Sequence, residues 1–266
     1  MLKQPVASTG APRSYLSFDA YSCMFVGIFG PPAGGIPGLI SQMKKAIIFG
    51  SSGFVGSHLL SGLLDSPDYE QVIAVARKNL NIAHPKLRLL IGDYNSLPDL
   101  KSEIVADEVF IALGTTKAKS PVEADYYRVD HDYPVLAARI AKEKGAKSVF
   151  LVTAVDANPN AKFFYVRTKG ETERDVIALN FEHTNIFRPS MIVGDRKENR
   201  SLLEGALMKF WPALNPLLAW KDGKYKGITG EDVAKAMIKS ANNQTDKLKI
   251  YEWKEMHELL QGQSKN

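Results

Sequence analysis

Short apolar runs alternate with longer amphipathic stretches along most of the chain after residue 43. Runs of no more than six residues that are rich in β-branched and aromatic side chains predict strands. The predicted strands cover residues 46–49, 71–76, 87–91, 109–113 and 148–152. Between the first two, Leu59, Leu60, Leu63 and Leu64 recur at helical intervals, which predicts a helix there.

A further helix is predicted at residues 134–144, where the pattern is amphipathic and Gly145 marks the end. Residues 247–251 predict a last strand, and residues 253–260 a final helix. Strands and helices that alternate at this length predict an α/β fold with a doubly wound parallel sheet. The apolar, proline-punctuated residues 210–220 are expected in a small C-terminal lobe on the substrate side, either lining a pocket or forming the core of the lobe.

The turn after the first predicted strand carries Gly50, Gly53 and Gly56, directly before the first helix. This order of strand, glycine turn and helix is typical of a dinucleotide-binding site. Gly50 allows a sharp turn, Gly53 lets the backbone approach a pyrophosphate, and Gly56 lets the helix pack closely. The amide groups and the positive end of the helix dipole favour the phosphate charge. The alternative is a glycine turn with a structural role alone.

Charged and small residues follow the other predicted strands. An NAD-specific site has an acid about twenty residues after the glycines, to bond the ribose 2′-hydroxyl. This chain has Arg77 and Lys78 instead, which suit a 2′-phosphate, so the prediction is NADP(H); the alternative is two solvated charges. Asp93 either bonds the adenine or caps the next turn. Ligands of such sheets bind beyond the carboxyl ends of the strands, so Asp93, Gly114 and Thr153 should share one crevice.

A candidate catalytic group follows the fifth predicted strand. Tyr165 and Lys169 are four residues apart, so on a helix they lie on one face. A lysine ammonium beside a phenol favours the phenolate, and the tyrosine can then exchange a proton with a substrate oxygen while hydride moves to or from a nicotinamide. The hydroxyl of Thr153 could orient that oxygen. The alternative is a surface tyrosine with a solvated lysine.

Composition bears on the remaining classes of function. With 45% hydrophobic and 24% charged residues, the chain has the values of an ordinary globular protein, and we expect it in the cytoplasm. Its net charge of +5 comes from scattered basic residues, which argues against a nucleic-acid partner. No apolar run is long enough to span a membrane. The only cysteine is Cys23, and the five histidines lack metal-ligand spacing, so no metal is expected.

Residues 1–42 differ from the rest of the chain because they are rich in glycine and proline and hold few charges. We expect an unstructured leader or an upstream start there, with a targeting peptide as the alternative. A single NAD(P)-binding domain is then expected to cover residues 43–266.

Several segments resemble the short-chain dehydrogenase/reductase superfamily, and more narrowly its atypical, epimerase-like branch typified by the Tat-interacting protein oxidoreductases. They are GSSGFVG, LGTTKAK, YYRVDHDY, FFYVRTKGETE, FRPSMIVGDRKENR and TGEDVAKAM. The resemblance implies a Rossmann fold and an NADP(H)-dependent oxidoreductase with a small carbonyl or alcohol substrate. It implies Tyr165 and Lys169 as the catalytic pair. With the residues argued above, the candidate cofactor-binding set is Gly50, Ser51, Ser52, Gly53, Phe54, Val55, Gly56, Arg77, Lys78, Asp93, Leu113, Gly114, Thr115, Lys169, Arg188, Ile192 and Arg200.

The chain departs from that family pattern at one important place. The family usually has two serines where this chain has Thr153 and Ala154, so a catalytic hydroxyl is lost if the second position is the one that matters. A regulatory protein that binds NADP(H) and senses its redox state is therefore the alternative function. Sugar-nucleotide epimerisation is a third, although the C-terminal part looks short for a nucleotide-sugar lobe. Monomer and dimer both remain open.

Overall fold

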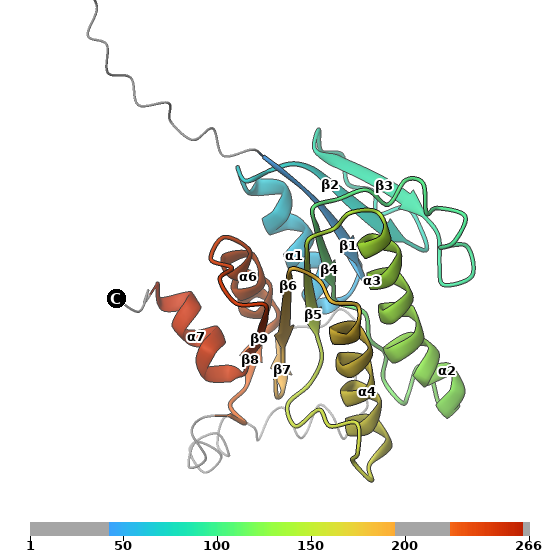
Figure 1. Cartoon of the computed structure of the whole chain (residues 1–266), viewed down its shortest axis with the longest axis vertical. Helices are drawn as coiled ribbons and strands as arrows, with labels where there is room; N and C mark the ends of the chain where they lie inside the picture. Colours follow the sequence, from blue (N-terminus) through green and yellow to red (C-terminus); the bar gives the residue numbers. More distant parts are fainter. Residues whose placement is uncertain (1–42, 195–223, 263–266) are drawn as a thin grey trace, which may run out of the picture. The chain divides into compact units, whose positions relative to one another are not determined.

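The computed structural model describes residues 43–194 and 224–262 (Figure 1). Expectations for residues 1–42, for Arg200 and for residues 210–220 lie outside these ranges. The main sheet has seven strands, all parallel, in the order β3-β2-β1-β4-β5-β6-β9. Their bounds are β1 Lys44–Phe49, β2 Tyr69–Ala76, β3 Leu87–Ile91, β4 Glu108–Ile111, β5 Ser148–Val152, β6 His183–Phe187 and β9 Leu248–Tyr251. The predicted α/β fold with a doubly wound parallel sheet is confirmed.

Helices cover both faces of the sheet. They are α1 Phe54–Asp65, α2 Glu123–Tyr127, α3 Tyr133–Glu143, α4 Phe164–Ala178, α6 Gly230–Ala241 and α7 Trp253–Gln261, with a π-helical segment η1 at Arg128–Asp132. Helices α1, α6 and α7 pack on one face, while α3 and α4 pack on the other (Figure 1). Two short strands, β7 Ile192–Val193 and β8 Ile228–Thr229, pair beside the main sheet.

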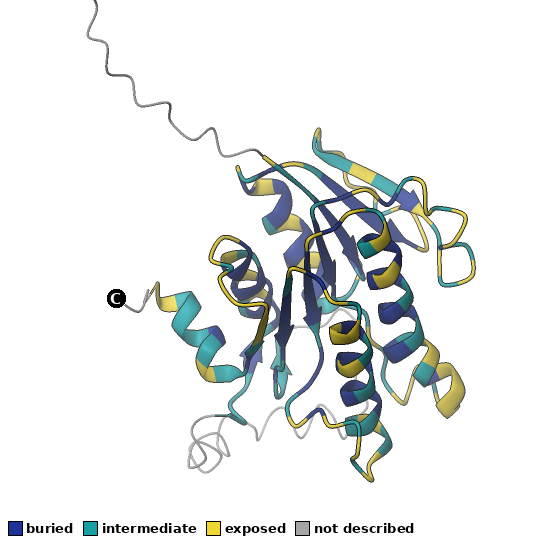
Figure 2. Ribbon diagram, in the orientation of Figure 1, coloured by how far each residue is buried: buried dark blue, intermediate teal, exposed yellow. Residues whose placement is uncertain are grey.

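Alternate residues of the central strands feed two separate cores. In β1, Ala46 and Ile48 join the cluster under α1 and α6, whereas Ile47 and Phe49 join the cluster under α3. This alternation follows from the two-residue period of a strand. Figure 2 shows the consequence: the central strands are almost wholly buried, and exposed residues gather on loops and on the outer sides of helices. Near-continuous apolar runs of this kind are what a parallel sheet covered on both faces requires.

The predicted strands agree with the structure to within two residues at each end, as do the helices predicted at 134–144 and 253–260. The apolar pattern does not, however, predict strand β6. Its sequence, HTNIF, begins with polar residues and contains Asn185, a residue type that is depleted in strands. The structure accommodates Asn185 because its amide donates to Gln244 Oε1 at 3.2 Å and its carbonyl accepts from the Tyr251 hydroxyl at 3.3 Å.

A buried carboxylate ties the amino-terminal ends of the strands together. Glu108, at the start of β4, bonds Lys44 at 2.9 Å, the Tyr69 hydroxyl at 2.5 Å and the Gln244 amide at 3.0 Å. Burial, and next the Glu108 carboxylate, raise the pKa of Tyr69, so the phenol remains a hydrogen-bond donor. This network lies at the opposite edge of the sheet from the glycine turn.

Truncating Glu108 to alanine leaves the lysine, phenol and amide without their shared acceptor in a buried place. We expect Glu108→Ala to lower the free energy of unfolding by about 3–5 kcal/mol. Glu143→Ala is the control, because Glu143 also pairs with a lysine, Lys101, but on the exposed surface, where such pairs contribute little. Urea denaturation measures both variants. Equal stability of the two would show that the Glu108 network is not a stabilising feature.

Candidate functional site

The glycine turn lies at the point where the strand order reverses, between β1 and β4. Gly50 has φ +90°, and a Cβ on it would lie 2.5 Å from the carbonyl oxygen of Ala112, beyond the end of β4. A Cβ on Gly56 would lie 2.0 Å from the carbonyl oxygen of Gly50, so α1 can start only where a glycine allows this approach. The site therefore opens at the switch point of the sheet, where doubly wound folds bind their ligands.

The residues of this turn fit a dinucleotide. Gly53 is the N-cap of α1, no side chain caps that helix end, and its first turn carries no acid. The hydroxyl of Ser51 is buried and has no partner among the described residues. An uncapped helix start with an unpaired hydroxyl beside it suits an anionic group. The sharp turn at Gly50 and the close helix packing at Gly56 agree with this geometry, while the approach of Gly53 to a pyrophosphate stays a prediction.

The other expected cofactor residues follow the carboxyl ends of neighbouring parallel strands. Arg77 and Lys78 follow β2, both exposed, and Asp93 follows β3. Asp93 Oδ1 accepts from the amides of Asn95 and Ser96 at 3.0 and 3.1 Å, so it caps the turn. The Ser96 amide holds the pKa of Asp93 below its usual value, and Arg77 adds a smaller effect in the same direction. Asp93 therefore caps the turn that follows β3, which is one of the two roles predicted for it.

Lys169 lies beside the end of β4, but it is paired with a carboxylate. Lys169 Nζ is 2.6 Å from Asp130 Oδ1, and both side chains are buried. The other carboxylate oxygen of Asp130 accepts from the Thr115 amide at 2.7 Å. A Cβ on Gly114 would lie 3.6 Å from Asp130 Oδ1 and 3.7 Å from Lys169 Nζ. The structure therefore brings together Gly114, Thr115 and Lys169, as expected, and adds Asp130.

Tyr165 is one turn before Lys169 on α4, and the residue is 48% exposed. Beside it lies Tyr126 of α2, a second residue that the sequence did not single out. Burial raises the pKa of Tyr126 most, followed by the charge of Asp130 and the proximity of Tyr165. The ring of Tyr126 packs edge-on against Phe164, with centroids 5.7 Å apart. Asp130 and Tyr126 both lie in the YYRVDHDY segment, which has two aspartates and three tyrosines, and nothing in their spacing singles out these two.

Thr153 is held in a way that the sequence did not predict. Its hydroxyl donates to Glu173 Oε1 at 2.6 Å instead of facing the crevice. Glu173 also accepts two bonds from Arg188, at 2.9 and 2.5 Å. Hydrogen bonding to the Glu173 carboxylate raises the pKa of Arg188, and the carboxylate compensates the guanidinium charge. Thr153 and Arg188 therefore fix α4 to the ends of β5 and β6. Ile192 is half-buried in β7.

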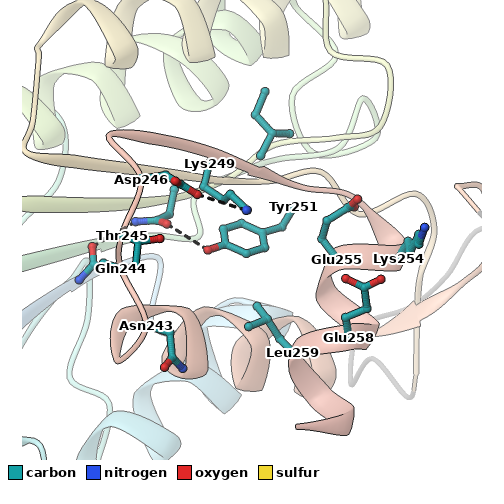
Figure 3. A pocket seen from close by; sticks show the side chains of 12 residues that line it. Asn243, Gln244, Thr245, Asp246, Lys249, Tyr251, Lys254, Glu255, Glu258 and Leu259 are labelled. Carbon is teal, nitrogen blue, oxygen red and sulfur yellow. Dashed lines mark hydrogen bonds and ion pairs between the residues drawn. The ribbon is translucent and has the colours of Figure 1, made fainter. Parts of the chain in front are cut away.

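A hollow of about 400 Å³ lies elsewhere, beside β9 and α7 (Figure 3). Residues that precede β9, such as Gln244 and Asp246, help to line it, so it belongs to the amino-terminal edge of the sheet. Its amides already bond one another, and Asp246 pairs with Lys249 at 3.2 Å. It is separate from the glycine turn and from Tyr165.

The described part of the chain shows neither a metal-binding cluster nor a membrane-spanning helix. Within residues 43–194 and 224–262, no cluster of three histidine, cysteine, aspartate or glutamate side chains is arranged to hold a metal ion. None of the described helices combines the length and apolar character that crossing a membrane requires.

Comparisons with known proteins assign the chain to one family. The family model described as "NAD dependent epimerase/dehydratase family" matches residues 46–252. "Protein FMP52, mitochondrial" of Candida albicans is 32% identical over 201 residues, which cover 73% of this chain and 86% of that protein. The protein of the same name from Candida glabrata is 34% identical over 156 residues, or 59% of this chain and 67% of the relative. The expected resemblance to epimerase-like NAD(P)-binding proteins is confirmed.

Solved structures agree at the level of the fold. "MoeE5 in complex with UDP-glucuronic acid and NAD" has a TM-score of 0.60 and 19% identity, covering 77% of this chain and 75% of that one. UDP-N-acetylglucosamine 4-epimerase from Methanobrevibacter ruminantium has a TM-score of 0.60 and 20% identity, covering 79% and 76%. At such identities the likeness establishes the architecture alone.

The cytoplasmic location expected from the sequence is contradicted. The relatives from Candida glabrata, Candida albicans, Saccharomyces cerevisiae and Aspergillus fumigatus all bear names that end in "mitochondrial". Overall composition could not have revealed this, because organelle targeting depends on a short segment and not on average charge or hydropathy.

The geometry around Thr153 gives a test of its structural role. Thr153→Val removes a buried hydrogen bond to the charged Glu173 carboxylate, whose Oε1 keeps only its bond from Arg188 Nε. We therefore expect a loss of about 1–3 kcal/mol in the free energy of unfolding. Thr153→Ser keeps the hydroxyl and is the matched control, with nearly normal stability. Thermal unfolding measures the stability of both variants. A stable valine variant would contradict the assignment.

Proposed function

Since the chain belongs to the NAD dependent epimerase/dehydratase family, we propose that it is an NADP(H)-dependent oxidoreductase of the short-chain dehydrogenase type. Its substrate would be a small carbonyl or alcohol compound. The observation that carries the proposal is the position of Tyr165 and Lys169. Both are on α4, at the edge of the sheet where the glycine turn opens, and Lys169 Nζ would be 3.7 Å from a Cβ on Gly114. An accessible phenol beside a buried lysine is suited to proton exchange.

Each part of the site has a separate task in this proposal. The open amino end of α1 and the hydroxyl of Ser51 bind the pyrophosphate, and Arg77 with Lys78 faces the adenosine phosphate. NADP(H), when bound, supplies or accepts the hydride. Tyr165 gives a proton to the substrate oxygen in reduction and takes it back in oxidation. Lys169 holds the nicotinamide ribose, and Thr153 supports α4 through Glu173 without touching substrate.

A second function is favoured by the partner of Thr153. Its hydroxyl is bonded to Glu173, and Ala154 carries none, so neither side chain is available to orient a substrate. A protein with this arrangement could bind NADP(H) and report its redox state to a partner with little or no catalysis. Tight NADPH binding that alters a protein association, together with no turnover across a broad carbonyl screen, would favour this sensor over the enzyme.

The two cations after β2 predict cofactor preference. NADP(H) should bind more tightly than NAD(H), because Arg77 and Lys78 attract the 2′-phosphate. Calorimetric titration of both cofactors measures the preference. Arg77→Asp should narrow or reverse it, whereas Arg139→Asp, a change of the same kind on the distant helix α3, should not. Tighter NAD(H) binding by the unaltered protein would overturn the prediction.

Removing the phenol hydroxyl tests the chemistry. Tyr165→Phe keeps the ring and its packing, so NADPH affinity should stay nearly constant while turnover falls roughly a hundredfold or more. Tyr127→Phe is the matched control: Tyr127 is on the neighbouring helix α2, where its ring stacks on His131 with centroids 4.4 Å apart. Lys169→Ala should weaken both turnover and cofactor binding. The assay follows NADPH oxidation with a carbonyl substrate found by screening, and full turnover by the Tyr165 variant would reject the mechanism.

We also propose a mitochondrial location, supported by the names of the relatives. Residues 1–42 contain Lys3 and Arg13 with Asp19 as the sole acid, and acid-poor, serine-containing segments suit a transit peptide. A fluorescent fusion of the whole chain should enter mitochondria, while a fusion of residues 43–266 should not. Diffuse signal from the whole-chain fusion would argue against this location.

A further inference from the structure

Lys169 does not present an isolated positive charge to Tyr165. Its ammonium is 2.6 Å from the Asp130 carboxylate, and the exposed fractions of the two residues are 6% and 1%. Two opposite charges so close together act at a distance as a dipole, and their separate effects on a third group largely cancel. An unpaired lysine would favour the Tyr165 phenolate; the observed pair favours it far less.

Asp130 is fixed in this position from several sides. Its Oδ2 accepts from the Thr115 amide at 2.7 Å, and its Oδ1 is 2.6 Å from Lys169 Nζ. Its backbone carbonyl accepts from the Thr172 hydroxyl at 2.8 Å, which joins η1 to α4. Because both its backbone and its carboxylate are held, Asp130 cannot turn away and release the lysine without breaking buried hydrogen bonds.

Other charged groups on the neighbouring segments form pairs of their own, while Arg167 of α4 donates to the backbone carbonyls of Ala161 and Lys162. On the same helix, Glu173 binds Arg188 of the segment after β6. In the loop after β5, Asp156 binds Lys224 at 2.9 Å. From α2, the neighbouring titratable group is Tyr126, whose pKa is raised by burial and next by the charge of Asp130. Lys169 lies on the same face of α4 as Tyr165, so its pairing with Asp130 bears directly on how readily Tyr165 ionises.

We propose that Asp130 is a positioning residue that neutralises Lys169 and so limits how strongly the lysine promotes ionisation of Tyr165, which directs the site towards carbonyl reduction. The proposal rests on Tyr165 being the acid of the proposed function. In reduction, a hydride from NADPH bonds the carbonyl carbon, the C=O π pair moves to oxygen, and the Tyr165 proton bonds that oxygen. Solvent can then reprotonate the half-exposed phenolate. Alcohol oxidation would need the phenolate at the start, so it should be favoured only at higher pH.

The direct test measures ionisation of Tyr165 without any substrate. Tyrosinate absorbance of the full chain is followed against pH, and the same titration of Tyr165→Phe is subtracted. Asp130→Asn keeps the shape of the side chain and removes its charge. We expect the midpoint of Tyr165 to fall by about one pH unit or more in that variant. An unchanged or higher midpoint would overturn the proposal.

Two further variants make the test independent of one substitution. Lys169→Met leaves the Asp130 charge uncompensated, so Tyr165 should ionise above the ordinary value of about 10; a midpoint at or below that value would contradict the role of Asp130. This arm also carries the test if the asparagine variant does not fold. Glu143→Gln, which removes an exposed carboxylate paired with Lys101, controls for net charge and should not move the midpoint.

Kinetics separate this inference from the proposed function. With an active carbonyl substrate, Asp130→Asn should shift the pH profile of kcat/KM to lower pH and lower the ratio of reduction to oxidation at neutral pH. An unshifted profile would refute the inference even if Tyr165→Phe abolishes turnover. If the absorbance midpoints move as expected while Tyr165→Phe keeps full turnover, the electrostatic role of Asp130 stands and the proposed function fails.

Discussion

The close packing of the glycine turn against the end of β4 is the constraint on which the rest of the site depends. A Cβ on Gly56 would lie 2.0 Å from the carbonyl oxygen of Gly50, and a Cβ on Gly50 would lie 2.5 Å from that of Ala112. Only glycine permits both approaches, so α1 begins directly over the point where the strand order reverses. The helix dipole, the uncapped amides and the backbone after β4 thus meet at one edge of the sheet.

Two buried ion pairs then fix α4 relative to that edge. Lys169 binds Asp130 of η1, and Glu173, one turn further along, binds Arg188 and the hydroxyl of Thr153. Buried pairs of this kind tolerate the loss of one partner poorly, because the other charge is then left without compensation. Their effect is to hold α4 rigidly while Tyr165, at its start, remains exposed. An enzyme gains from this combination, since the reacting group must reach substrate from a fixed support.

The parts of the molecule that depend on local pattern could be predicted from the sequence, while those that depend on distant contacts could not. Apolar runs gave the main strands, and the i, i+4 spacing placed Tyr165 and Lys169 on one helix face. Strand β6 escaped prediction because Asn185 is accommodated by Gln244, which lies 59 residues away. Likewise, the partners of Lys169 and Thr153 depend on how η1 and α4 cross the end of the sheet. Nothing in the spacing of Asp130 or Glu173 specifies those contacts.

A structure of the protein with NADP⁺ bound would show directly whether these residues hold the cofactor. We expect the pyrophosphate at the amino end of α1 and the 2′-phosphate within hydrogen-bond distance, about 3 Å, of Arg77 or Lys78. We also expect the nicotinamide ring on the Tyr165 side of the crevice, with Lys169 beside its ribose. A nicotinamide directed away from Tyr165, or a 2′-phosphate that touches neither cation, would contradict the proposed NADP(H)-dependent oxidoreductase.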